Sequence, residues 1–280
     1  MQVQWYPGQM AKAKRLLREN LKFVDAVIEV LDARIPASSR NPDIRELIMQ
    51  KPVVAVLTRS DLADPKLTDA WIDALQKKYF AATAVDAKKG RGMKKLLGCL
   101  KTIPRQGKFG KRPLRLMVVG IPNVGKSSLI NRLIGRSAAQ TGDRPGVTKG
   151  KQWVRLPGNL ELLDMPGLLW PKIENKQQAF YLAAAGTIKD EILDRVELGY
   201  QLVSYLREKE PESLFNRYKL QQDLDPVEML TEIGRKSGCL VKGGEVDLEA
   251  AASVLVKDFR EARLGRLTLE KPCEQEEENA

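Results

Sequence analysis

The sequence predicts two successive domains: an α/β domain with a mostly parallel sheet, and then an all-helical domain. In the first part of the chain, short apolar runs alternate with helical patterns, which is typical of parallel strands covered by helices on both faces. After Pro171 the strand patterns stop and only helical patterns continue. We therefore expect an α/β domain over residues 1–174 and a helical domain over residues 175–280. The length of 280 residues is enough for two domains of ordinary size.

Six short apolar segments predict the strands of the α/β domain. Four of them end in polar or glycine-containing segments and are expected to be parallel strands: residues 26–31, 52–57, 80–85 and 114–119. The other two, residues 152–156 and 160–163, flank Pro157-Gly158-Asn159, so we expect them to form a hairpin.

Helical patterns occupy the segments between these strands, at residues 41–50, 66–79, 93–101 and 126–134. A further helix at the N-terminus combines an apolar side with a basic cluster: Lys12, Lys14, Arg15, Arg18 and Lys22. In the helical domain we expect helices over residues 177–185, 191–208, 213–218, 226–237 and 248–263.

The composition excludes several kinds of active site. Histidine is absent, so the chain has no histidine general base, no histidine metal ligand and no Ser-His or Cys-His pair. The three cysteines are far apart in the sequence and indicate neither a disulfide framework nor a zinc site. No apolar run approaches the length of a membrane helix, and the N-terminus lacks the apolar region of a signal peptide. We expect a cytoplasmic protein that does not bind membranes.

A glycine-rich motif predicts a phosphate-binding loop. Residues 120–127, Gly-Ile-Pro-Asn-Val-Gly-Lys-Ser, match G-x-x-x-x-G-K-[ST] and lie between a predicted strand and a predicted helix, the context that this motif requires. Its glycines let backbone N–H groups surround phosphate oxygens, and the helix N-terminus adds positive charge. Lys126 is expected to bridge the β- and γ-phosphates and Ser127 to hold Mg²⁺. The nucleotide-binding residues expected from this motif are Asn123, Val124, Gly125, Lys126, Ser127 and Ser128.

Two further segments predict switch elements around a γ-phosphate. Asp164-Met-Pro-Gly167 follows the predicted strand 160–163, so that Asp164 can reach Mg²⁺ through water and the Gly167 N–H can contact the γ-phosphate. Residues 142–148 form a glycine-rich stretch without a strand pattern, as a loop that orders around a γ-phosphate requires. Thr148 in that stretch is expected to close on Mg²⁺ and the γ-phosphate. We therefore place Thr148 and Gly167 in the catalytic site.

The base-recognition motif stands before the phosphate-binding loop. GTPases read guanine with an Asn-Lys-x-Asp sequence at a strand end, and the corresponding segment here is Thr58-Arg59-Ser60-Asp61. A second base-contacting loop is expected near the third strand, at Asp86 and Ala87. This order of motifs is that of a circularly permuted GTPase. The carboxylate of Asp61, which would accept from guanine N1–H and N2–H, argues against the alternative of an ATPase.

Basic residues are concentrated in one stretch of the chain. Residues 87–116 contain eleven Lys or Arg and no Asp or Glu, and the whole chain has a formal net charge of +11. Together with the basic N-terminal helix, this stretch favours phosphate contacts with RNA. A solvated surface is the simpler alternative. A membrane surface is disfavoured because no large apolar face with aromatic anchors accompanies the charge.

These motifs together resemble the YlqF/RbgA family of circularly permuted GTPases that assist ribosome assembly. The matching segments span nearly the whole chain in family order: Gln4–Gly8, Asp32–Pro36, Ser39–Pro42, the phosphate-binding loop, Thr141–Gly146, Leu163–Gly167, Trp170-Pro171, Gly238-Cys239 and Gly243-Gly244. The resemblance implies a GTPase, with GTP and GDP as ligands and Mg²⁺ as cofactor. It implies that the large ribosomal subunit stimulates hydrolysis, that hydrolysis releases the protein, and that the helical domain contacts ribosomal RNA. We expect a monomer.

Three features depart from the usual GTPase patterns. Thr58 and Arg59 replace the common Asn and Lys of the guanine motif, so Asp61 must carry most of the base selectivity. The residue after Gly167 is leucine and not the water-orienting glutamine of Ras-like enzymes, which is normal for the family. Position 9 is glutamine where the family has a histidine proposed to be catalytic.

Two site residues have alternative interpretations. Gln9 is a candidate catalytic residue, because its amide offers a donor and an acceptor to an attacking water; alternatively it contacts RNA or solvent. Asn123 is a candidate ligand of a K⁺ ion beside the phosphates, as in several GTPases that lack the glutamine; alternatively it bonds its own backbone. If Gln9 is not catalytic, the chain fits an RNA-binding assembly scaffold that binds GTP and hydrolyses it poorly.

Overall fold

The computed structural model describes residues 7–104, 112–135, 153–163, 173, 175–188, 194–221 and 223–272, with the backbone alone described at positions 7–10, 13, 43 and 44. These residues belong to two compact units. Residues 173–269 form the helical unit. The described residues before position 173, together with Glu270, Lys271 and Pro272, form the α/β unit.

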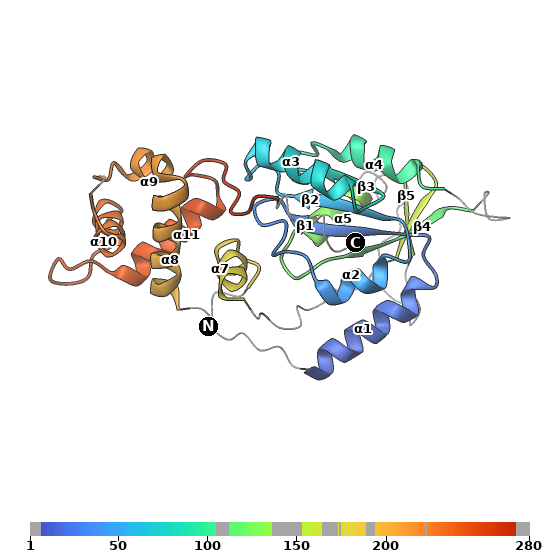
Figure 1. Cartoon of the computed structure of the whole chain (residues 1–280), viewed down its shortest axis with the longest axis horizontal. Helices are drawn as coiled ribbons and strands as arrows, with labels where there is room; N and C mark the ends of the chain where they lie inside the picture. Colours follow the sequence, from blue (N-terminus) through green and yellow to red (C-terminus); the bar gives the residue numbers. More distant parts are fainter. Residues whose placement is uncertain are drawn as a thin grey trace. The chain divides into compact units, whose positions relative to one another are not determined.

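A six-stranded sheet forms the centre of the α/β unit (Figure 1). Its strands are β1 Ala26–Asp32, β2 Val53–Thr58, β3 Ala81–Ala84, β4 Leu114–Val119, β5 Trp153–Leu156 and β6 Leu160–Leu163. In the order β3-β2-β1-β4-β6-β5, every neighbouring pair is parallel except β5 and β6, which form the predicted hairpin. All residues of β1 and β2 are buried, as expected for inner strands covered on both faces. The predicted mostly parallel sheet is confirmed.

Helices cover both faces of this sheet. Those among the described residues are α1 Pro7–Leu21, α2 Pro42–Ile48, α3 Pro65–Gln76, α4 Met93–Lys101 and α5 Lys126–Gly135. On one face, Leu17 of α1, Ile48 of α2 and Leu75 of α3 join Val27 and Leu31 of β1 in one apolar cluster. Because side chains alternate along a strand, the intervening strand residues point to the opposite face. Helices α4 and α5, whose buried leucines lie outside that cluster, cover the opposite face.

Local sequence signals fix the ends of the helices, as α3 illustrates. The Asp64 carboxylate accepts a hydrogen bond from the Leu67 N–H at 2.8 Å, and Pro65 occupies the first helical turn. Both features favour a helix start, because they satisfy or remove donors that have no partner inside the helix. The helix ends at Gln76, and residues 77–79, which the apolar periodicity includes in it, form a turn instead.

The helical unit is built from helices, three of which begin at a capping aspartate among the described residues. Its described helices are α7 Lys176–Ala184, α8 Arg195–Lys209, α9 Pro211–Tyr218, α10 Pro226–Lys236 and α11 Leu248–Arg260. Aspartates cap the N-termini of α8, α10 and α11 by accepting hydrogen bonds from first-turn N–H groups. A Cβ at Gly199 of α8 would lie 2.6 Å from the Cβ of Ala252, so this glycine lets α8 and α11 pack closely. No described helix of either unit is long and apolar enough to cross a lipid bilayer.

Candidate nucleotide-binding site

The sheet topology brings the predicted nucleotide motifs to one edge. The strand order reverses at β1, which pairs with β2 on one side and with β4 on the other. In open α/β sheets, ligands bind outside the carboxyl ends of the strands at such a switch point. Strand β1 ends at Asp32, β2 ends at Thr58 and β4 ends at Val119, directly before the phosphate-binding loop. The guanine motif and the phosphate-binding loop therefore meet although many residues separate them in the sequence.

Two glycines let the phosphate-binding loop pass close to β1 and β2. Gly120 has φ of 151°, and a Cβ there would lie 2.6 Å from the Val30 carbonyl oxygen. Gly125 has φ of 97°, and a Cβ there would lie 3.2 Å from the Thr58 hydroxyl oxygen. A side chain at either position would displace the loop, because neither the backbone conformation nor the space accommodates it.

Lys126 lies at the start of α5, where unpaired backbone N–H groups and the helix dipole favour an anion. Its Nζ donates a hydrogen bond to the Ile121 carbonyl at 2.6 Å. Burial lowers the pKa of Lys126 to about 8, because the cation is partly removed from water without a negative partner. Ser127 and Ser128 follow on the exposed side of the helix start. This cradle, with a desolvated cation and a helix N-terminus, fits the phosphates of a nucleotide.

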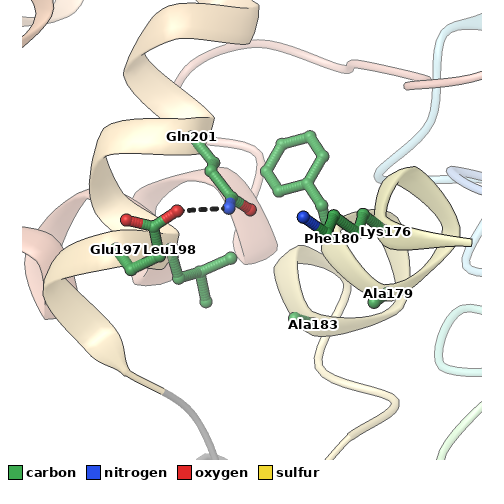
Figure 2. Close-up of a pocket in the computed structure, with 7 residues that line it drawn as sticks. All are labelled: Lys176, Ala179, Phe180, Ala183, Glu197, Leu198 and Gln201. Atoms are coloured by element: carbon green, nitrogen blue, oxygen red, sulfur yellow. Dashed lines mark hydrogen bonds between the residues drawn. The ribbon is translucent and has the colours of Figure 1, made fainter. Parts of the chain in front are cut away.

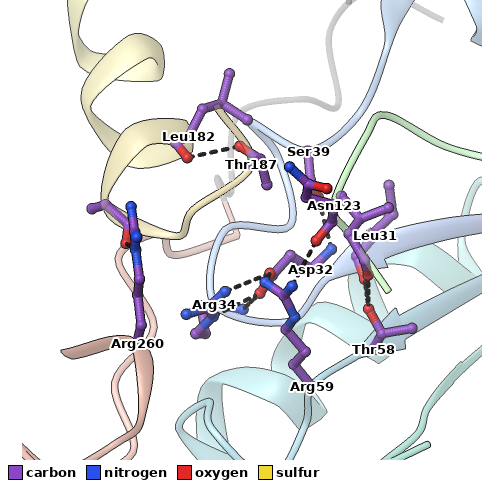
Figure 3. Close-up of polar contacts among 12 residues, drawn as sticks. Leu31, Asp32, Arg34, Ser39, Thr58, Arg59, Asn123, Leu182, Thr187 and Arg260 are labelled. Carbon is purple, nitrogen blue, oxygen red and sulfur yellow. Dashed lines mark hydrogen bonds and ion pairs between the residues drawn. The ribbon is translucent and has the colours of Figure 1, made fainter. Parts of the chain in front are cut away.

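A buried ion-pair network joins the end of β1 to both nucleotide motifs (Figure 3). The Asp32 carboxylate is fully buried and accepts hydrogen bonds from the Arg34 guanidinium at 3.0 and 2.8 Å and from Arg59 Nη1 at 2.9 Å. Burial alone would raise the pKa of Asp32, but the Arg34 and Arg59 guanidiniums hold it below its ordinary value. Arg59 also donates from Nη2 to the Asn123 carbonyl in the phosphate-binding loop, at 2.7 Å.

Thr58 provides a second link between the two motifs. Its hydroxyl lies 2.9 Å from the Leu31 carbonyl oxygen and also within hydrogen-bonding distance of the Val124 carbonyl oxygen. A hydroxyl has one proton, so it donates to one of these oxygens at a time. Either bond ties the end of β2 to a neighbouring segment, β1 or the phosphate-binding loop. The residue that replaces the usual asparagine therefore retains a hydrogen-bonding role.

The two predicted base-contacting loops lie side by side. The Ser60 N–H donates to the Val85 carbonyl at 3.4 Å, and β2 pairs with β3 in parallel. Asp86 is buried, and its Oδ1 accepts from the Lys89 N–H at 2.9 Å. Its Oδ2 is buried as well and has no hydrogen-bond partner among the described residues. Asp61 is half-buried at the same edge.

The structure does not describe the side chains of several predicted site residues. Thr148, Asp164 and Gly167 lie outside the described residues. Gln9 lies in α1, but only its backbone is described. Conversely, Asp32 has no role that is predicted from the sequence, apart from its place in the family resemblance. The signal that identifies it is an acidic residue at the end of a buried strand, because a buried carboxylate requires charged or hydrogen-bonding partners.

A separate pocket lies in the helical unit between α7 and α8 (Figure 2). It has a volume of about 210 Å³ and is lined by Lys176, Ala179, Phe180, Ala183, Glu197, Leu198 and Gln201. The Gln201 amide donates to the Glu197 carboxylate at 2.6 Å. None of the residues predicted for the nucleotide site lines this pocket.

Comparison with known proteins identifies the family. Residues 115–225 match the family described as "50S ribosome-binding GTPase". The chain is 44% identical to ribosome biogenesis GTPase A of Priestia megaterium over 99% of both chains. The chain belongs to the ribosome biogenesis GTPase A family. It is 32% identical to the Thermotoga maritima member over 96% of this chain and 95% of that one.

The solved structure of a family member has the same fold. The crystal structure of GNP-bound YlqF from T. maritima matches with a TM-score of 0.68 and 28% sequence identity, over 93% of this chain and 98% of that chain. Membership of the family confirms the predicted GTPase activity and guanine nucleotide as ligand. It also agrees with the circular permutation, which explains why the family match begins at the strand before the phosphate-binding loop.

Proposed function

We propose that this GTPase assists assembly of the large ribosomal subunit, binding it in the GTP form and leaving it after hydrolysis. The observation that carries the proposal is the direct link between guanine motif and phosphate-binding loop, the Arg59 to Asn123 hydrogen bond of 2.7 Å. It joins the two motifs that a guanine nucleotide would contact at the sheet edge. The relatives' names, ribosome biogenesis GTPase A among them, supply the ribosomal context.

The expected roles of the site residues follow from their positions. Lys126 would bridge the β- and γ-phosphates, and Asp61 would accept from the guanine N1–H and N2–H. Asp86 and Ala87 would border the base, beside Ser60, whose N–H is already paired with the Val85 carbonyl.

A magnesium ion fits the exposed start of α5. Ser127 is exposed there, next to Lys126, as the P-loop ligand of Mg²⁺ must be. Within the described part of the chain, no group of three or more acidic or cysteine side chains could hold a metal without the nucleotide. We therefore expect Ser127, with Thr148 and Asp164 of the switch segments, to hold the ion together with the phosphates. When bound, Mg²⁺ would neutralise charge that develops on the phosphate oxygens.

A potassium ion beside the phosphates is the proposed source of further positive charge. Asn123, the candidate ligand, is exposed in the phosphate-binding loop and has φ of 58°, with its carbonyl held by Arg59. Fixing the backbone of Asn123 would position a ligand for the ion. GTP turnover should be faster in K⁺ than in Na⁺ buffer, and equal rates would exclude this role.

The charge distribution favours the α/β unit as the RNA-contacting part. The α/β unit, residues 4–172 and 270–280, contains 33 Lys or Arg against 19 Asp or Glu, whereas residues 173–269 contain 14 against 17. The positive charge of the chain therefore lies in the α/β part, and the helical part is slightly acidic. Contacts with RNA phosphates depend on such an excess of cations. We propose that the helical unit contributes less to phosphate binding than the α/β unit.

Part of the basic stretch is already neutralised by acidic partners. Arg112 pairs with Asp25 at 2.7 Å, and Arg115 pairs with Glu161 at 3.2 Å. Helix α4, by contrast, presents Lys94 and its neighbours to solvent; the exposed basic residues there and just before it are Lys88, Lys89, Arg91, Lys94, Lys95 and Lys101. We propose that the α4 lysines contact ribosomal RNA.

Two measurements test the proposed function. GTP turnover with and without purified large subunits, in K⁺ buffer, should show low basal activity and clear stimulation. Subunit binding should be stronger with a non-hydrolysable GTP analogue than with GDP, and equal binding in both states would contradict the release step.

The RNA face has its own test with matched variants. The K94E/K95E variant on α4 should weaken subunit binding and flatten its dependence on salt, because fewer counterions are released. The K242E/K257E variant changes the charge of two exposed lysines of the helical unit by the same amount. Equal effects of the two double variants would contradict the assignment of the RNA face to α4.

A further inference from the structure

Glu270 is a buried carboxylate that neither the nucleotide site nor the RNA face uses. It is 9% exposed and lies directly after the last residue of the helical unit, but belongs to the α/β unit. Its carboxylate accepts hydrogen bonds from the Ala37 N–H at 2.7 Å, from the Ser38 N–H at 3.0 Å and from the Ser38 hydroxyl. Its carbonyl accepts from Trp71 Nε1 at 3.0 Å. The residue is thus held at both its side chain and its backbone.

The segment that Glu270 holds is the loop of residues 36–39, which follows the end of β1. This 36–39 loop folds back on the strand: Ser39 Oγ accepts a hydrogen bond from the Asp32 N–H at 3.0 Å and lies 3.2 Å from the Pro36 carbonyl, to which it donates. The Ser39 N–H donates to the Ile35 carbonyl at 3.0 Å. The position of the 36–39 loop therefore fixes the backbone of Asp32.

Asp32 in turn connects to the nucleotide site. Its carboxylate holds Arg59 of the guanine motif at 2.9 Å, and Arg59 holds Asn123 of the phosphate-binding loop at 2.7 Å. The hydrogen bonds that lead from Glu270 through the 36–39 loop to Asp32 and Arg59 join groups that are buried or partly buried. The hydrogen bond from Arg59 to Asn123 is exposed. Hydrogen bonds that form a chain in the low-dielectric interior of a protein polarise one another, so that their contributions are coupled.

The residue before Glu270 is anchored in the other unit. The Leu269 carbonyl accepts a hydrogen bond from Tyr205 Oη of α8 at 2.7 Å. Two consecutive residues are thus fixed, Leu269 within the helical unit and Glu270 within the α/β unit.

We propose that Glu270 is a positioning residue for the guanine nucleotide site, acting through the 36–39 loop, Asp32 and Arg59. The proposal rests on the nucleotide site proposed above. Losing the Glu270 carboxylate releases the 36–39 loop, and the looser Asp32 holds Arg59 and the phosphate-binding loop less well. Nucleotide binding then weakens, although Glu270 touches no part of the nucleotide.

Nucleotide affinity of full-length variants tests this role. Glu270→Ala should raise the Kd for GDP and the KM for GTP about five- to tenfold, the low end of typical coupling between separate sites. The basal kcat should stay near that of the wild type, because no group that contacts the reacting atoms changes. Glu270→Gln, whose amide oxygen still accepts from Ala37 and Ser38, should restore most of the affinity. Lys271→Ala, at the exposed next position, is the matched control and should bind as the wild type does.

Measurements on the same variants can also overturn the proposal. A Glu270→Ala protein that melts at lower temperature but binds GDP with wild-type affinity would make Glu270 only a stabilising contact. If Glu270→Ala does not fold, Ser38→Ala removes a single hydrogen-bond donor and should raise the Kd in the same direction; unchanged affinity there also overturns the proposal. A wild type that does not bind guanine nucleotides would instead overturn the nucleotide site itself.

Discussion

The Arg59 guanidinium donates to the backbone carbonyl of Asn123 at 2.7 Å, across 64 residues of sequence. The other terminal nitrogen of the same guanidinium, Nη1, pairs with the Asp32 carboxylate at 2.9 Å. A guanidinium can bridge two acceptors because its donors form a rigid planar fork. The guanine motif thus has arginine in place of the usual lysine at a position where the buried Asp32 carboxylate is a partner. This bridge connects the end of β1 to the two motifs of the candidate nucleotide site.

Replacing Arg59 by lysine should weaken GTP and GDP binding about tenfold, or ~1.4 kcal/mol, because one ammonium cannot keep both contacts in this geometry. Arg59→Ala should weaken binding further. Equilibrium titration with a fluorescent guanine nucleotide measures both. Arg207→Lys, at an exposed position of α8, is the matched control. An Arg59→Lys protein with wild-type affinity would show that the bridge does not contribute to the site.

Asp32→Asn should destabilise the α/β unit by about 3–5 kcal/mol, because it leaves the buried Arg34 cation without its counter-charge. The effect depends on pH. The guanidiniums lower the pKa of Asp32 in the folded protein despite its burial, so the ionised carboxylate stabilises the fold above the unfolded-state pKa of about 3.9. That stabilisation is lost as pH falls through the lower folded pKa. Urea unfolding measures the free energy of unfolding of the wild type and of Asp32→Asn between pH 3 and pH 7. The wild type should be more stable by a constant amount at higher pH, and this advantage should shrink only below about pH 4. An advantage that does not change with pH would contradict the ion pair.

Lys126→Ala should reduce GTP affinity by about a hundredfold or more, because the phosphates lose a charge-assisted contact at the helix start. The fold should survive, since within the described part of the chain the Lys126 ammonium hydrogen-bonds only to the Ile121 carbonyl. Calorimetric titration with GDP and GTP measures the loss, and a thermal melt checks folding. Wild-type-like affinity would remove Lys126 from the site.

Asp61→Asn should weaken guanine nucleotides about 10- to 100-fold and admit xanthine nucleotides, because an amide can donate where the carboxylate accepted. Competition between GDP and xanthosine diphosphate measures the exchange of preference. Asp69→Asn, at an exposed position of α3, is the control. If the variant at position 61 keeps its preference for guanine, the assignment of the guanine motif is wrong.

The periodic parts of the chain could be predicted from sequence, and the polar network could not. Apolar runs and the phosphate-binding motif are local patterns, so they give the six strands and α5 nearly to the residue. The contacts of Glu270 with Ala37 and Ser38 join positions more than 230 apart, and no local pattern encodes such a pairing. Likewise, the partners of Arg112 and Arg115 are Asp25 and Glu161, which lie outside the basic stretch. A charge count along the sequence therefore overstates how much of that stretch is available to RNA.

Gln9 follows Pro7 and Gly8 at the start of α1, whose next turns carry Lys12 and Arg15. A glutamine amide can orient an attacking water without acting as a strong base, as in Ras-like enzymes. Because α1 is basic, docking on ribosomal RNA would place the beginning of this helix in a defined position. We therefore predict low intrinsic turnover and a stimulated rate that depends on Gln9.

Gln9→Ala should keep GTP affinity and subunit binding but lose the stimulated rate by about a hundredfold, the usual effect of removing one contact to the transition state. Gln9→His, which restores the residue expected from the family, should recover much of that rate, because an imidazole can also orient water. Single-turnover hydrolysis on saturating large subunits separates this effect from binding. Lys12→Ala is the control for a role in RNA contact: it should weaken subunit binding and leave the rate at saturation unchanged. If Gln9→Ala behaves as Lys12→Ala does, Gln9 contacts RNA and the water is oriented by another group.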